Sequence, residues 1–99
     1  MLKQAIPKIL VIDDEETLRY TVETFLLREG YELDTAESYK DGVDKLSGSN
    51  FDLILTDIML GDGTGVDILR EVNKRNMSCP VILITGYPNI ETATDAVRE

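Results

Sequence analysis

Residues 8–16 read KILVIDDEE, an apolar run that ends abruptly in four consecutive acidic residues, Asp13 to Glu16. A continuous apolar run of this kind is typical of a strand that is buried on both faces of a sheet. Adjacent carboxylates repel one another and resist burial. Their position at the end of a buried strand therefore needs an explanation, either as the start of a helix or as part of a site.

The same kind of apolar run returns twice, as FDLILT (51–56) and PVILIT (80–85), whereas YELDTA (31–36) alternates apolar and polar residues as an edge strand does. Amphipathic stretches over 15–30, 38–48, 65–75 and 89–99 follow these four segments and predict helices. Four β-α units with short connections predict an α/β fold, a parallel sheet with helices on both faces. The expected architecture is a flavodoxin-like doubly wound sheet with strand order 2-1-3-4.

Helical spacing assigns an inward face to the first and third helices. The residues expected to face inward are Leu18, Val22, Phe25 and Leu26 in the first helix and Val66, Leu69 and Val72 in the third. Ser38 is expected to cap the start of the second helix, and Gly30 fits the position just past the end of the first.

The composition bounds the size and the chemistry of the protein. Its 99 residues, 42% of them hydrophobic, are typical of one globular domain. The formal net charge of −9 argues against binding to nucleic acid or to an anionic membrane, and it suits a protein that binds cations or a basic partner. Cys79 is the only cysteine, and no apolar run is long enough to cross a bilayer, so a cytoplasmic location is expected. The chain has no histidine, which excludes catalysis by a histidine of its own.

Four polar residues come directly after strands that the predicted order places side by side. Asp13 and Asp14 follow the first strand, Asp57 ends the third, and Thr85 ends the fourth. Sites in open α/β sheets form at the carboxyl ends of the strands, where the strand order reverses. Three carboxylates without a nearby histidine or cysteine predict a hard cation such as Mg²⁺. Asp57 would then be a nucleophile toward an activated phosphoryl group, and Thr85 could donate a hydrogen bond to a phosphoryl oxygen.

Each of these residues also has a plainer explanation. Asp14, Glu15 and Glu16 could serve only to start the first helix, where acidic side chains favour the helix dipole. Asp57 alone is more often a turn residue than a nucleophile, and Thr85 alone is an ordinary strand residue. Their coincidence at one end of one sheet favours the site, whereas for Glu15 and Glu16 the helix start is at least as good an explanation.

The segments LVIDDEE, LILTDIMLGDGTG and VILITGYPNIETA, in this order and spacing, resemble the receiver domain of two-component response regulators, the CheY-like family. The last segment is most similar to receivers of σ54-type transcription activators or hybrid sensor kinases. The resemblance implies a phosphorelay protein that takes a phosphoryl group onto Asp57 from a sensor histidine kinase or a phosphotransfer protein. It implies Mg²⁺ held by Asp13, Asp14, Asp57 and the backbone carbonyl of Met59, with Thr85 as the switch hydroxyl. Such a domain is no enzyme beyond its own phosphorylation and dephosphorylation.

The chain departs from the family in two places. Proline is usual where Gly61 stands, which predicts a looser loop, and the family's fifth strand, fifth helix and conserved lysine fall beyond Glu99. Residues 1–99 are therefore interpreted as a C-terminally incomplete receiver domain, and a homodimer is possible. An uncovered VILI edge supports this, because natural sheets avoid long, apolar, unpaired edges.

Two other functions stay open at this point. One is a receiver-fold interaction module that is never phosphorylated. The other is a phosphatase of the haloacid dehalogenase type, which also uses an aspartate after a strand but needs a second one where Met59 stands.

Overall fold

The computed structural model describes residues 6–84, so Thr85 and the helix expected over 89–99 lie outside the described residues. The elements in chain order are β1 (Lys8–Ile12), α1 (Glu16–Arg28), β2 (Glu32–Ala36), α2 (Tyr39–Gly48), β3 (Leu53–Asp57), β4 (Met59–Leu60), β5 (Gly63–Thr64), α3 (Gly65–Lys74) and β6 (Val81–Ile84). None of the helices among these residues is long and apolar enough to cross a membrane.

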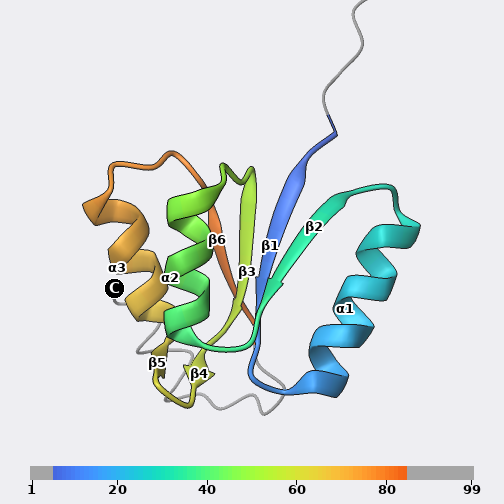
Figure 1. Ribbon diagram of the computed structural model, residues 1–99, viewed down its shortest axis with the longest axis horizontal. Coiled ribbons are helices and arrows are strands. Elements are labelled where there is room, and N and C mark those ends of the chain that lie inside the picture. Colours follow the sequence, from blue (N-terminus) through green and yellow to red (C-terminus); the bar gives the residue numbers. More distant parts are fainter. Residues whose placement is uncertain (1–5, 85–99) are drawn as a thin grey trace, which may run out of the picture.

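The main sheet has four parallel strands in the order β2-β1-β3-β6. With β6 as its fourth strand, this is the predicted 2-1-3-4 order, and the alternating strand β2 lies at an edge as expected. Figure 1 shows α2 and α3 on one side of the sheet and α1 on the other, as a doubly wound fold requires.

The larger core lies between the sheet and the α2–α3 layer. Leu10 and Ile12 of β1 and Ile54 of β3 pack there against Ile68 and Val72 of α3, all of them fully or almost fully buried. Burying each such side chain contributes about 1.5–3 kcal/mol relative to leaving it in water. The predicted inward position of Val72 is confirmed, whereas Ile68, which the prediction left out, is completely buried.

The smaller core lies under α1, and here one sequence prediction is wrong. Leu26 packs against Ile9 and Val11 of β1, with Val22 partly buried beside them. Phe25, expected to face inward, is 57% exposed. The physical reason is that α1 covers β1 and β2, while the described residues place no second helix next to it on this face (Figure 1). On the same side of the molecule, Ile82 of β6 is 48% exposed.

The turns between elements follow the predicted signals, with one addition. Ser38 accepts a hydrogen bond from the Asp41 N–H and caps α2, and Gly30 ends the α1 turn with a φ of +94° that favours glycine. The addition is the short antiparallel hairpin β4–β5, which joins the end of β3 to the start of α3. Its last residue, Thr64, begins α3 through a capping box with Asp67.

Candidate functional site

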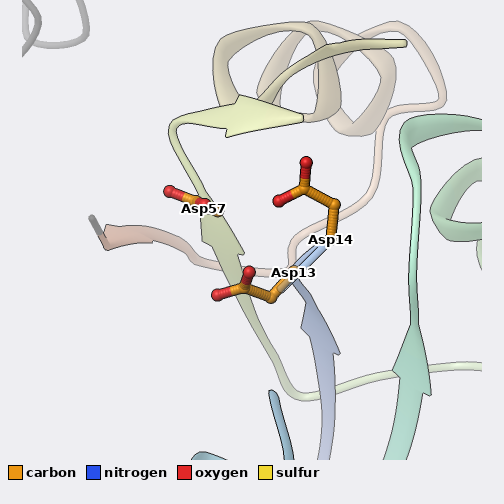
Figure 2. Close-up of side chains that lie close together, drawn as sticks. All are labelled: Asp13, Asp14 and Asp57. Atoms are coloured by element: carbon orange, nitrogen blue, oxygen red, sulfur yellow. The ribbon is translucent and has the colours of Figure 1, made fainter. Parts of the chain in front are cut away.

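Three carboxylates predicted to converge lie together at the carboxyl ends of β1 and β3. These strands are parallel neighbours with Ile12 opposite Thr56, so the residues that follow, Asp13 and Asp57, come to the same edge of the sheet. Asp14 adds a third carboxylate from the start of the β1–α1 turn, as Figure 2 shows. One ligand oxygen from each of the three residues lies within 4.8 Å of the others.

Asp13 is the buried member of this acidic cluster. Its side chain has no solvent exposure, and its Oδ1 accepts a hydrogen bond of 2.9 Å from the Glu15 N–H. Its Oδ2 is also buried and has no hydrogen-bond partner among the described residues. Burial raises the pKa of the Asp13 carboxyl, the negative charges of Asp57, Asp14 and Glu15 add to the rise, and the Glu15 N–H opposes it. A buried carboxylate oxygen without a donor is destabilising, and a bound cation would satisfy it.

Asp57 is half-buried at the end of β3. Burial raises the pKa of its carboxyl, and the charges of Asp14 and Glu15 act in the same direction, while the backbone N–H groups of Ile58 and Met59 lower it. Its backbone carbonyl accepts a hydrogen bond of 3.1 Å from the Thr56 hydroxyl, which is buried. The two raised pKa values have the same physical origin, because burial and like charge both disfavour ionisation.

The four acidic residues of the opening stretch have two different roles. Asp13 and Asp14 belong to the cluster, whereas Glu15 lies at the N-cap of α1 and Glu16 in its first turn, both exposed. Glu15 makes no side-chain capping hydrogen bond, so its contribution is charge near the helix dipole rather than a cap.

Sequence reasoning missed Arg19, which donates a hydrogen bond of 2.7 Å from Nη1 to the backbone carbonyl of Asp13. This contact ties the first turn of α1 to the end of β1. No sequence pattern indicated it, because the bond ends on a backbone atom. It holds the backbone of the buried carboxylate in place and brings a positive charge near the cluster.

The donor set fits a hard cation. It consists of carboxylate oxygens only, which suit Mg²⁺ rather than a softer metal. One oxygen from each of the three residues lies within 4.8 Å of the other two, so side-chain rotation could bring all three onto one ion. Exposed Asp14 leaves the cluster open to water and to a ligand.

Two further residues belong to the predicted site. Met59 begins β4, two residues after Asp57, and its side chain is 61% exposed. Thr85 lies outside the described residues. Cys79 packs against the larger core, and burial raises the pKa of its thiol, in agreement with a structural rather than a reactive cysteine.

Comparison with known proteins identifies the class to which this fold and site belong. The model of the response regulator receiver domain family matches residues 9–99. The chain therefore belongs to the family of response regulator receiver domains.

Individual relatives agree with this assignment. The chain is 35% identical over 91 residues to the response regulator protein PilR of Pseudomonas aeruginosa, covering 92% of this chain and 20% of PilR. It thus spans about a fifth of the length of this relative. The structure of response regulator TrrA from Thermotoga maritima in complex with Mg²⁺-BeF superposes with a TM-score of 0.78 at 35% identity, covering 83% of this chain and 71% of that chain. The beryllofluoride-activated NtrC4 receiver domain dimer gives a TM-score of 0.81 at 32% identity, covering 92% of this chain and 75% of that chain.

Proposed function

We propose that this receiver domain accepts a phosphoryl group on Asp57, in a site that Asp13, Asp14, Asp57 and the Met59 carbonyl complete around Mg²⁺. The observation that carries the proposal is the buried Oδ2 of Asp13, which has no hydrogen-bond partner within residues 6–84, in a cluster of three carboxylates within 4.8 Å. Such an arrangement is destabilising unless a cation is bound. Binding of a cation explains why such an acidic cluster stands at the end of a buried strand.

The residues of this chain would divide the chemistry among them. Asp13 and Asp14 hold the cation, and Mg²⁺ when bound neutralises charge on the phosphoryl oxygens. A carboxylate oxygen of Asp57 forms the new bond to phosphorus, the P–N bond to the donor imidazole breaks, and the imidazole leaves with the electron pair and is protonated. Thr85 would donate a hydrogen bond to the phosphoryl group and so act as the switch hydroxyl.

The phosphohistidine has to come from a partner, because this chain has no histidine. A sensor histidine kinase or a phosphotransfer protein fits this requirement. A homodimer in the activated state follows by analogy with the NtrC4 receiver dimer. A cytoplasmic location and control of a transcriptional output follow from the resemblance to receivers of σ54-type activators.

We further propose that the domain continues past residue 99 in its working form. Phe25 and Ile82 are about half exposed on the α1 side of the main sheet. A fifth strand of this four-stranded sheet and the family's fifth helix would cover them. The match to the TrrA and NtrC4 chains, which leaves a quarter or more of each unmatched, supports this extension.

Nothing in the site favours the two alternatives. Met59 stands two positions after Asp57, where a phosphatase of the haloacid dehalogenase type would need a second aspartate. A module that is never phosphorylated would have no need for a destabilising acidic cluster.

Fluorine NMR with beryllofluoride, an analogue of the acyl phosphate group, tests the proposal. The parent protein should give a bound fluorine signal only when Mg²⁺ is present, and Asp57→Asn should give none. Asp52→Asn is a matched control, since Asp52 is an exposed aspartate just before the same strand. A bound signal that persists in Asp57→Asn would refute the assignment of Asp57.

A further inference from the structure

The tip of the β4–β5 hairpin is fastened to the start of α2 by one carboxylate. Asp62 accepts a hydrogen bond of 2.7 Å at Oδ1 from the Tyr39 N–H and one of 3.0 Å at Oδ2 from the Lys40 N–H. These are the first two N–H groups of α2, which have no partner within the helix. Both hydrogen bonds lower the pKa of the Asp62 carboxyl, so the group stays ionised. Ser38 caps the third N–H, that of Asp41, so Asp62 and Ser38 together satisfy the first three N–H groups of α2.

A packing contact reinforces this attachment. A Cβ on Gly63 would lie 2.9 Å from ring atoms of Tyr39, so the hairpin backbone lies directly against that ring. Tyr39 in turn packs on the larger core. The hairpin tip is therefore held to α2 by a charged group and by an aromatic ring.

The same hairpin borders the acidic cluster. Its first strand begins at Met59, two residues after Asp57, and Leu60 is buried. Gly61 in the turn lies close to the cluster, because a Cβ placed there would be 3.9 Å from Oδ2 of Asp14. Glycine gives this turn no conformational restraint of its own. The restraint on the turn comes from its neighbour Asp62.

We propose that Asp62 is a positioning residue for the phosphoacceptor site. By holding the hairpin to α2, it fixes the backbone of Met59 and Gly61 relative to Asp14 and Asp57, and so favours binding of the cation. This inference rests on the proposed function, since it assigns Asp62 a role in the same Mg²⁺ site. Because Asp62 joins the hairpin to α2, a displacement of the hairpin would also disturb the start of α2.

The test compares Mg²⁺ dissociation constants of the parent and Asp62→Ala, measured by titration calorimetry with Mg²⁺ alone. Groups bonded directly to a metal ligand contribute about 10–100-fold to metal affinity, and because Asp62 acts through the hairpin backbone we expect the lower end, about tenfold. Asp44→Asn is the control, because Asp44 is exposed on the same helix and makes no described hydrogen bond. This control should bind Mg²⁺ as the parent does.

A rescue variant separates positioning from simple helix capping. Proline is favoured at the first central position of a turn, and Gly61 is not among the described glycines with positive φ. Gly61→Pro in the Asp62→Ala background should therefore restore most of the lost Mg²⁺ affinity without restoring the cap of α2. Unchanged Mg²⁺ affinity in folded Asp62→Ala, or a loss that Gly61→Pro leaves untouched, would overturn the proposal.

Amide hydrogen exchange distinguishes this inference from the proposed function. If the parent binds no Mg²⁺, the proposed function fails, but exchange at Met59 to Gly61 still measures the restraint. Faster exchange there in Asp62→Ala than in Asp44→Asn would support the restraint, and equal exchange would refute it.

Discussion

Replacing Asp13 by asparagine should stabilise the protein in the absence of Mg²⁺, because it removes a negative charge from the acidic cluster. The asparagine side chain has the same shape, and its Oδ1 can still accept the hydrogen bond from the Glu15 N–H. The charge of Asp13 is lost, and with it two of the three repulsive pairs in the cluster. Asp13→Asn should therefore unfold at higher urea than the parent when Mg²⁺ is absent.

The distances between the carboxylates determine how much the free energy of unfolding should rise in Asp13→Asn. Two unit charges 4.8 Å apart repel by about 0.9 kcal/mol in bulk water and about 3.5 kcal/mol at an effective dielectric constant of 20. Because Asp14 is exposed and solvent screens it, the gain should be about 1–3 kcal/mol. The parent, in contrast, should gain about 2.7 kcal/mol from Mg²⁺ at 100 times its dissociation constant. Asp13→Asn should gain much less.

The assay is urea unfolding followed by circular dichroism, with and without Mg²⁺. Asp44→Asn makes the same change in net charge at an exposed site and should behave as the parent does in both conditions. A variant less stable than the parent without Mg²⁺, or one that gains as much from Mg²⁺ as the parent, would refute the reasoning.

Three other perturbations follow from the same structure. In the absence of Mg²⁺, the raised pKa values of Asp13 and Asp57 mean that the folded state binds protons more readily than the unfolded state. The free energy of unfolding, measured in urea, should therefore fall as the pH rises above 3.8, the ordinary pKa of an aspartate, and a rise would contradict this prediction. Gly65→Ala should lower the free energy of unfolding by about 1–3 kcal/mol, because its Cβ would lie 2.5 Å from the Asp57 carbonyl oxygen. Gly48→Ala is the control, since a Cβ there meets no atom within 4 Å, and it should leave the free energy of unfolding unchanged in the same urea titration. Loss of the α3 cap in Thr64→Ala should lower the free energy of unfolding by about 1 kcal/mol. A thermal unfolding midpoint equal to that of the parent would contradict this prediction.

The sheet and the acidic cluster could be predicted from the sequence because both depend on local patterns. Continuous apolar runs identified the buried strands, and alternation placed β2 at the edge. Parallel strands end at one edge of a sheet, so Asp13 and Asp57 had to meet once the strand order was known. Neither step required knowledge of side-chain packing.

The features that the sequence did not predict depend on contacts between distant segments. The two-residue strands of the β4–β5 hairpin are too short to show a period, and Asp62 reaches backbone groups 22 and 23 positions away. Helical spacing correctly directed Leu26 to the core, but Phe25 on the same face is exposed because the covering layer does not extend that far. Periodicity gives the direction of a side chain, and the neighbouring elements decide its burial.

The most direct test of the central claim is phosphorylation of Asp57 itself. The protein would be incubated with acetyl phosphate, with and without Mg²⁺, and analysed by intact mass, and the modified residue would be located by borohydride reduction and peptide mapping. We expect the protein to gain one phosphoryl group at Asp57 when Mg²⁺ is present, and Asp57→Asn to gain none. No gain in the folded parent, or a phosphoryl group on another residue, would contradict it.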